Sequence, residues 1–265
     1  MSNVSRQDPR TVLNASSGNA AVFIAVLALG ALVFAAGRLS DRPILLPGGS
    51  LGESQVQDLG APGTFRRAFV DPAGKTVVLE SPPSAIVSVI LGGDEMLARL
   101  VEPERVSSVT YLADDPGISN VAGFYPAGVT RNYGDIEEVI AAQPDLVLLA
   151  AFTNAVTAAM LLDAGIALLR FTSFDTHDDI RHNVRMLAQA VGEEARGEAW
   201  IAEMDQRLSA VRQSVEGRER PRVLFYGMSG STAGPGSLMH ETISLAGGKN
   251  VYCRNRARIV AQNLS

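Results

Sequence analysis

The stretch Arg131–Ala150, RNYGDIEEVIAAQPDLVLLA, decides how the middle of this chain folds. The i, i+3, i+4 spacing of its apolar residues predicts a short amphipathic helix over 136–142. Pro144 prevents that helix from continuing, and the apolar run Leu146–Ala150 is typical of a buried parallel strand. The stretch is therefore half of a strand–helix–strand unit.

Strands and helices alternate on both sides of this stretch. A hairpin is predicted over Phe65–Glu80, and Gly92 and Gly93 form a turn in which Asp94 can cap the following helix. The further predicted strands are 85–90, 106–109 and 167–171, the further predicted helices are 95–100 and 156–164, and residues 110–134 form a long loop. Such alternation favours an α/β fold with a mostly parallel sheet.

The second half of the chain begins with helical spacing. It predicts a long helix near 178–191 and a second helix on the face from Trp200 to Val215. RVLFY at 222–226 predicts a new strand, and a helix over Leu238–Leu245 follows a Gly/Ser-rich turn. We therefore expect two Rossmann-like lobes joined by a long helix. The second lobe is too short to cover both faces of a sheet, so we expect it to be incomplete.

The N-terminal part carries a membrane signal. Residues 20–37 form an uncharged apolar run flanked by arginines, which is typical of a cleaved signal or an uncleaved transmembrane anchor. The predicted organisation is a cytoplasmic tail at 1–19, this helix at 20–37, a linker at 38–63, an α/β ligand-binding lobe at 64–175, a connecting helix at 176–191 and a partial second lobe at 192–265. The abrupt arginine-rich tail after Tyr252 indicates a truncated or frameshifted product, for which we expect weak ligand binding.

Composition excludes several classes of function. The formal net charge of -5 gives no reason to expect nucleic acid, because phosphate binding needs clustered Lys and Arg. The single cysteine, Cys253, rules out an intramolecular disulfide and a cysteine-rich zinc site.

Two alternatives rest on local clusters. Gly227–Ser231 is one residue short of the G-x-S-x-G nucleophile elbow of hydrolases, and no acidic residue lies between Ser229 and His240 to complete a triad. A metal site would draw on a group of histidines and acids near the start of the long helix, which are Asp175, His177, Asp178, Asp179 and His182. The alternative to a metal site is capping of that helix by Thr176 or Asp178.

The order of these elements resembles one family. FVDPAGKTVVLESPPSAIVSVI, the Gly-Asp-Glu turn, QPDLVLL, RVLFY and LAGGKNV occur in the same order as in the substrate-binding proteins of ABC importers for iron–siderophores, cobalamin or haem. The resemblance covers about Phe65–Val251. It implies a binding protein rather than an enzyme, located in the periplasm or on the outer face of the inner membrane, and partnered by a permease and an ATPase.

The resemblance also implies a ligand between the lobes, with no further cofactor. An iron–siderophore or related metal chelate is the first expectation, cobalamin is the second, and haem would need Tyr125 or Tyr133 as an axial ligand. Arg131 would face chelating oxygens, for which its planar fork of donors is suited. Glu137 would dock with the permease. The implied ligand contacts are Gly92, Gly93, Tyr111, Tyr125, Arg131 and Phe152 from the first lobe, and Met228, Ser229 and Thr232 from the second. An anchored interaction protein that has lost ligand binding is the remaining alternative.

Overall fold

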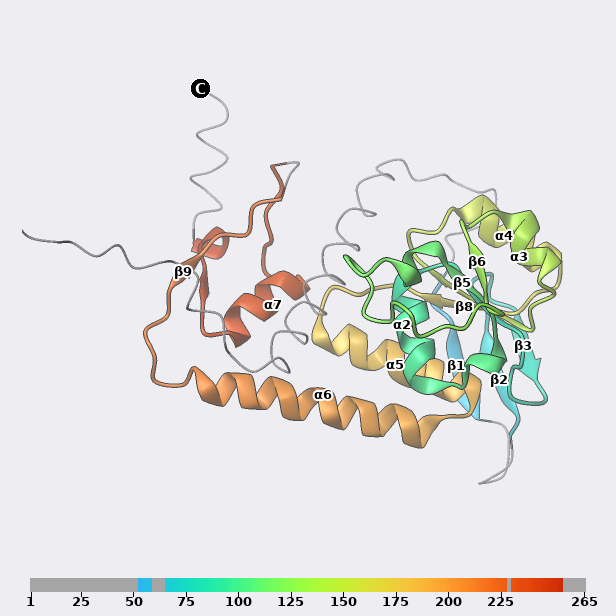
Figure 1. Ribbon diagram of the computed structural model, residues 1–265, viewed down its shortest axis with the longest axis horizontal. Coiled ribbons are helices and arrows are strands. Elements are labelled where there is room, and N and C mark those ends of the chain that lie inside the picture. Colours follow the sequence, from blue (N-terminus) through green and yellow to red (C-terminus); the bar gives the residue numbers. More distant parts are fainter. Residues whose placement is uncertain (1–51, 59–64, 228–229, 255–265) are drawn as a thin grey trace, which may run out of the picture.

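The computed structural model describes residues 52–58, 65–227 and 230–254, and its largest sheet has five strands and lies within an α/β unit at the right of Figure 1. The strand order is β6-β5-β4-β7-β8, and every neighbouring pair is parallel. The strands are β4 (Ile86–Ser88), β5 (Val106–Thr110), β6 (Thr130–Asn132), β7 (Leu146–Ala150) and β8 (Leu168–Phe171). The prediction of an α/β fold with a parallel sheet is confirmed. β6 lies within the predicted long loop, where the sequence indicated no strand.

Helices cover both faces of the sheet, which explains the uninterrupted apolar run of β7. Leu146, Leu148 and Ala150 pack on one face with α2 (Leu91–Leu100) and α5 (His177–Val191). Val147 and Leu149 pack on the other face with α3 (Ile136–Ala141) and α4 (Ala155–Asp163). Both sets are buried because successive strand residues point to opposite faces.

Asp145 has a structural role in the QPDLVLL stretch. Its carboxylate accepts hydrogen bonds from the backbone N–H groups of Ser84 (2.6 Å) and Ala85 (3.0 Å). These groups lie just before β4, which is the neighbour of β7 in the sheet. The Pro-Asp pair therefore ends one helix and also fixes where the central strand begins.

A small antiparallel sheet precedes the parallel one. It comprises β1 (Gln55–Asp58), β2 (Arg67–Val70) and β3 (Thr76–Leu79), and the β2–β3 pair confirms the predicted hairpin. The expectation of an unstructured linker over 38–63 is wrong at 55–58, which pair with β2 over four residues. The sequence QVQD contains one apolar residue, so its pairing depends on the partner strand.

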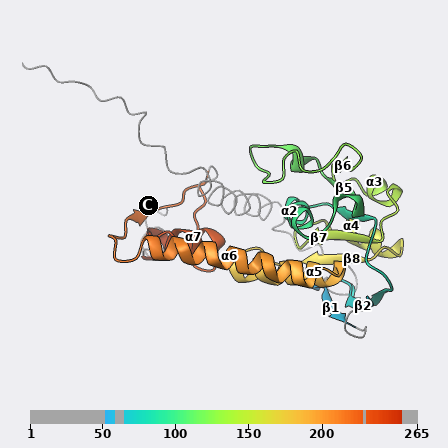
Figure 2. The same cartoon turned by 60° about the horizontal axis from the view of Figure 1, so that its bottom comes forward.

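Two long helices follow the parallel sheet and lie side by side (Figure 2). Thr176 and Asp179 form a capping box at the start of α5, which confirms the expected Thr176 cap. The buried side chains of α5 belong to the core of the α/β unit. α6 (Glu194–Ser214) buries only Gly197 and Ile201 among its residues and runs past the edge of that unit (Figure 1).

A short C-terminal segment lies at the far end of α6. It holds α7 (Leu238–Leu245), whose bounds match the prediction, and a parallel pair of two-residue strands, β9 (Arg222–Val223) and β10 (Lys249–Asn250). The strand expected over 222–226 therefore stops at Val223. Leu224 and Tyr226 are 52% and 72% exposed, so no packed sheet supports the rest of that run. The division into two lobes stays a prediction.

The expected signal or anchor helix at 20–37 lies outside the described residues. Within residues 52–58, 65–227 and 230–254, no helix has the length and apolar content needed to cross a membrane.

Candidate ligand-binding site

The carboxyl ends of the parallel strands bring the predicted first-lobe residues to one edge of the sheet. Tyr111 directly follows β5, Tyr133 directly follows β6, and Phe152 lies just after β7. Ligands of open parallel sheets bind outside this edge. The topology therefore gives a physical reason to look for a site here.

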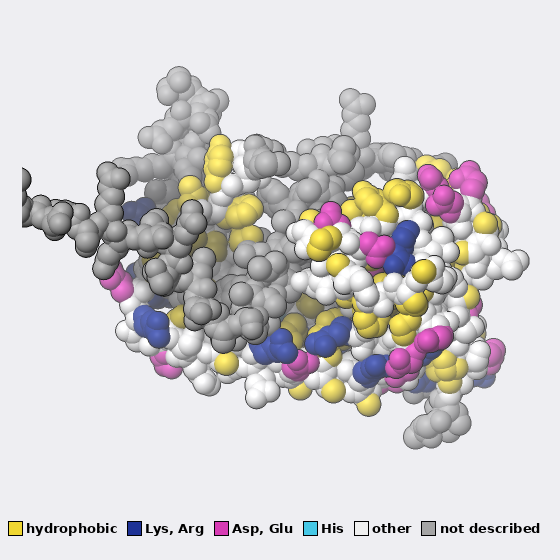
Figure 3. All heavy atoms as spheres, in the orientation of Figure 1, with side chains coloured by type: hydrophobic (Ala, Val, Ile, Leu, Met, Phe, Trp, Pro, Cys, Tyr) yellow, Lys and Arg dark blue, Asp and Glu magenta, His cyan; other side chains and the backbone are white. Residues whose placement is uncertain are grey.

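Tyr111 and Tyr133 form an exposed aromatic pair. Their ring centroids are 4.7 Å apart and their planes differ by 19°, which is a stacked arrangement. The residues are 48% and 70% exposed, although aromatic rings usually bury most of their surface. Phe124 (44%) and Phe152 (36%) are also exposed. Hydrophobic side chains gather on the face of the α/β unit that is turned to the viewer in Figure 3. We refer to the Tyr111–Tyr133 pair as the aromatic platform.

A buried polar layer lies among the strand ends behind this edge. The Asn132 amide donates to the Ser88 carbonyl and to the Ser108 hydroxyl, both at 2.9 Å, and so links three strands. Asp94 accepts from the backbone N–H (3.2 Å) and the hydroxyl (2.5 Å) of Thr110. The expectation that Asp94 caps this helix is therefore wrong. α2 begins at Leu91, so Asp94 lies inside its first turn.

Asp94 is an unusual carboxyl group. It is fully buried, and its Oδ1 atom has no hydrogen-bond partner among the residues that the structure describes. Burial raises the pKa of Asp94 well above its ordinary value, against the opposing effect of the Thr110 hydrogen bonds. Burial also raises the pKa of the neighbouring Glu95, whose carboxylate accepts from Asn120.

Gly92 and Gly93 lie in the first turn of α2, where close packing explains the need for a small residue at position 93. A Cβ atom on Gly93 would lie 2.5 Å from Ser88 Oγ and 3.1 Å from Ile90 Cγ1. Gly93 is buried, and Gly92 is half-buried. The role of Gly93 in this structure is therefore the packing of α2 against β4.

Tyr125 was expected to contact the ligand or to bind haem iron, and its position contradicts this. It is 4% exposed, and its hydroxyl donates to the Asp94 carbonyl at 2.5 Å. Burial raises its pKa, so the phenolate that would bind iron is disfavoured. Tyr133, the other candidate axial ligand, is exposed but stacked on Tyr111.

Arg131 is engaged within the protein. Its Nε and Nη2 atoms donate to the two carboxylate oxygens of Asp114 at 2.8 and 2.9 Å. Nη2 also donates to the Tyr125 carbonyl (3.0 Å), and Nη1 donates to the carbonyls of Pro126 (3.4 Å) and Val129. The hydrogen bonds from Arg131 lower the pKa of Asp114. A guanidinium has five N–H groups, and all five are used.

The second-lobe residues are only partly placed. Met228 and Ser229 lie outside the described residues, and with them the centre of the Gly227–Ser231 hydrolase motif. Thr232 is half-buried, and its hydroxyl oxygen is buried without a hydrogen-bond partner within residues 52–58, 65–227 and 230–254. Glu137, the candidate docking residue, is exposed in the first turn of α3.

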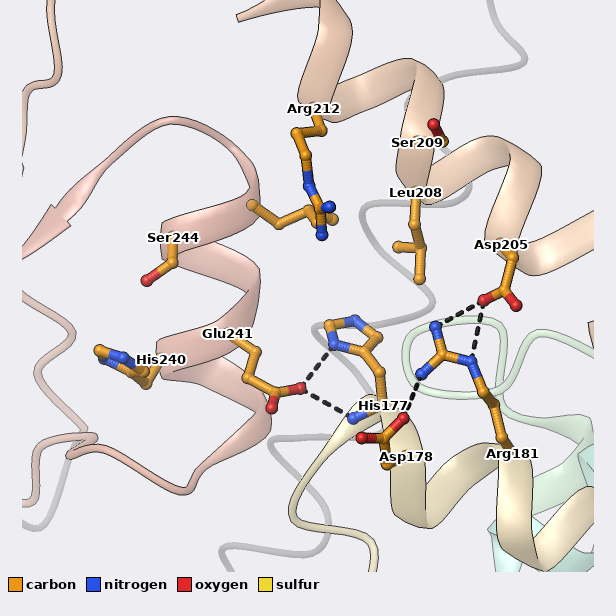
Figure 4. A pocket seen from close by; sticks show the side chains of 11 residues that line it. His177, Asp178, Arg181, Asp205, Leu208, Ser209, Arg212, His240, Glu241 and Ser244 are labelled. Atoms are coloured by element: carbon orange, nitrogen blue, oxygen red, sulfur yellow. Dashed lines mark hydrogen bonds and ion pairs between the residues drawn. The ribbon is translucent and has the colours of Figure 1, made fainter. Parts of the chain in front are cut away.

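A separate pocket of about 650 Å³ lies between α5, α6 and α7 (Figure 4). Glu241 Oε2 accepts from the His177 backbone N–H at 2.8 Å and lies 2.7 Å from His177 Nδ1. Arg181 pairs with Asp178 and Asp205, and Arg212 points into the pocket. Positive and negative groups are thus mixed, and the main polar tie joins α7 to the N-terminus of α5.

The predicted metal ligands do not converge around this pocket. His177 faces Glu241, whereas His182 lies 3.5 Å from Glu53. Asp179 is used in the capping box. Among the residues that the structure describes, no group of three His, Cys, Asp or Glu side chains could hold a metal ion.

Two residues that shape the site were not predicted from the sequence. Asp114 was not recognised as the partner of Arg131, and Phe124 was not recognised as exposed. A local signal was available for the aromatic platform, because Tyr111 and Tyr133 each directly follow a strand. That signal required recognising β6, a strand of three residues.

Comparison with known proteins agrees with the fold. The periplasmic binding protein family matches residues 86–263. A cobalamin-binding protein of Halobacterium salinarum is 27% identical over 214 residues, which are 77% of this chain and 57% of that protein. An uncharacterised ABC transporter substrate-binding lipoprotein of Bacillus subtilis is 24% identical over 197 residues, 68% of this chain and 59% of that protein.

Among solved structures, the periplasmic haem-binding protein RhuT of Roseiflexus is similar, with a TM-score of 0.52 and 25% identity. The match covers 64% of this chain and 66% of that one. The chain spans 57% and 59% of the length of the two curated relatives. The prediction of a binding protein rather than an enzyme is confirmed by these relatives. Because the family match extends over more than half of the 265 residues, the chain belongs to the periplasmic binding protein family.

Proposed function

We propose that this chain is the substrate-binding component of an ABC importer and that its ligand is a metal-bearing chelate. The observation that carries the proposal is the exposed aromatic platform at the carboxyl edge of the parallel sheet. Exposed rings lose contact with water when a flat, weakly hydrated ligand covers them, so they are a favourable surface for such a ligand. Family membership and the named relatives support the same reading.

Cobalamin or haem is the first choice of ligand, ahead of an iron–siderophore. The sequence-based expectation for a siderophore included Arg131 facing its chelating oxygens. The donors of Arg131 are all bound within the protein. A stacked tyrosine pair favours a ring system, and the named relatives bind cobalamin and haem. An iron–siderophore remains the second candidate because the fold also matches a siderophore-binding protein, with a TM-score of 0.56 at 15% identity.

The importer partners follow from the same proposal. A permease and an ATPase would receive the ligand, and the protein would work on the outer side of the inner membrane, attached or free. Glu137 is the proposed permease contact. It is exposed on α3 and makes no ion pair within the described part of the chain.

Titration calorimetry with cyanocobalamin, haemin and a ferric hydroxamate tests the proposal directly. We expect one of the first two to bind, and we expect Tyr111→Ala and Tyr133→Ala each to weaken that binding about two- to tenfold, since stacking on an aromatic face contributes roughly 0.5–1.5 kcal/mol. Met160→Ala is a matched control, because Met160 is also exposed (47%) but lies on α4. Absence of binding to all three probes would reject the proposal.

A further inference from the structure

The two tyrosines of the aromatic platform need support from elsewhere. An exposed ring pair gains about as much from stacking as it loses in side-chain freedom. β5 and β6 pair up to Thr110 and Asn132, which brings Tyr111 and Tyr133 next to each other, but the pairing stops one residue before each tyrosine. The orientation of the two rings in the stack therefore depends on contacts made by the chain beyond the strand ends.

Arg131 and Asp114 lie immediately beside the platform on the same two segments. Arg131 precedes Tyr133 by two positions, which is the spacing of one face of an extended chain. Asp114 ends the short 3₁₀ helix that Tyr111 begins, one turn away. The ion pair between them therefore joins the two tyrosine-bearing segments, close in sequence to both tyrosines.

Arg131 also fixes the turn that lies between those segments. Its remaining donors reach the carbonyls of Tyr125, Pro126 and Val129. Tyr125 is anchored in turn by its hydroxyl on the Asp94 carbonyl. The Arg131 guanidinium thus contacts the connection between β5 and β6 near both of its ends.

We propose that Arg131 is a positioning residue that holds Tyr111 and Tyr133 in one stack, through Asp114 and the carbonyls of residues 125–129, instead of contacting the ligand itself. Arginine suits this task because its planar fork binds a carboxylate with two hydrogen bonds and still reaches three carbonyls. Lysine keeps the charge but offers a single point of attachment. The effect on ligand affinity rests on the proposed function, whereas the effect on the stack does not.

The first experiment uses the ligand-free full chain. With its five tyrosines ring-labelled, NMR should detect ring-to-ring contacts between Tyr111 and Tyr133. We expect Arg131→Lys and Asp114→Asn each to abolish this contact. Arg105→Lys is the matched control, since Arg105 also binds a glutamate and two backbone carbonyls, but beside α5. If Arg131→Lys fails to fold, Asp114→Asn still tests the same bond.

The second measurement is the affinity for cyanocobalamin and haemin. We expect about a tenfold loss in Arg131→Lys, the order of magnitude for ordering two side chains on binding. Asp114→Asn should reproduce that loss, and the double variant should lose no more than either single variant. Loss of the ring contact in a protein that binds neither of these probes nor the ferric hydroxamate would support the positioning role and reject the proposed function. An intact ring contact in both variants, or weakened binding with the ring contact intact, would overturn the inference.

Discussion

Replacing Asp94 with asparagine should stabilise the protein at neutral and alkaline pH. The carboxyl group is fully buried; Oδ2 accepts two hydrogen bonds from Thr110, and Oδ1 has no partner in the described part of the chain. Asparagine has nearly the same shape and keeps an oxygen acceptor for Thr110. It removes the ionisable proton and with it the possibility of a buried charge.

The direction of the pH dependence follows from the raised pKa of Asp94. The native state binds this proton more tightly than the unfolded chain does. The associated stability is therefore fully present below the ordinary carboxyl pKa and is lost as pH rises through the native pKa. Asparagine does not titrate, so its advantage should grow over the same range. We expect it to reach about 1–3 kcal/mol, the cost of a buried group without its partner.

Urea unfolding followed by the fluorescence of Trp200, the single tryptophan, measures this difference. The free energies of unfolding of Asp94→Asn and the unmodified protein should be close at about pH 4 and should diverge towards about pH 9. Asp175→Asn is the control, because Asp175 is exposed and its side chain makes no hydrogen bond within the described residues. A constant difference at all pH values, or an advantage that shrinks as pH rises, would refute the reasoning.

Three further changes test other parts of the structure. In thermal denaturation, Gly93→Ala should lower the free energy of unfolding by roughly 1–3 kcal/mol, because its Cβ would lie 2.5 Å from Ser88 Oγ. Gly128→Ala is the control, because the position has open space, and it should change the free energy of unfolding by no more than about 0.5 kcal/mol. Equal effects of the two changes would contradict the packing argument. Glu241→Gln should accelerate hydrogen exchange in α7 but not in β7, because it removes a charged acceptor from the α5 N-terminus, an interaction of about 0.3–1 kcal/mol. Glu219→Gln is the exposed control. Unchanged exchange in α7 would show that the contact between Glu241 and His177 contributes little to holding α7 in place. In the unmodified protein, amides of β9 and β10 should exchange faster than those of β7, because each strand has two residues and Leu224 and Tyr226 beside β9 are exposed; equal protection would show a more stable C-terminal segment than we describe.

The sequence was most informative where one physical rule determined the outcome. β7 and α7 were predicted with the bounds that the structure shows. An uninterrupted apolar run that follows a proline, and a helical run ended by glycines, each leave few alternative assignments. β1 and β6 were missed, since strands of four and three residues with few apolar side chains depend on their neighbours for pairing.

The candidate site was less predictable than the fold. The placement of Tyr111 and Phe152 at the sheet edge could be predicted, because each lies just after a predicted strand. The contacts of Arg131 could not be predicted, because its partners Asp114 and Val129 lie on a loop whose path no local rule determines. Tyr125 was assigned to the ligand for the same reason, although its hydroxyl bonds to the Asp94 carbonyl and the ring is in the core.

The attachment of residues 52–54 has a mechanical consequence. The Ser54 hydroxyl donates to the Leu168 carbonyl (3.1 Å) and accepts from the Arg170 N–H (3.0 Å), while Gly52 bonds to Pro72 and to Arg170. A pull on the preceding chain therefore reaches the β8 edge of the parallel sheet and the β2–β3 turn at the same point. Because these bonds share the force, they should break together at a higher threshold instead of opening one by one. The α/β unit would thus stay folded under tension that reaches it through its N-terminal side.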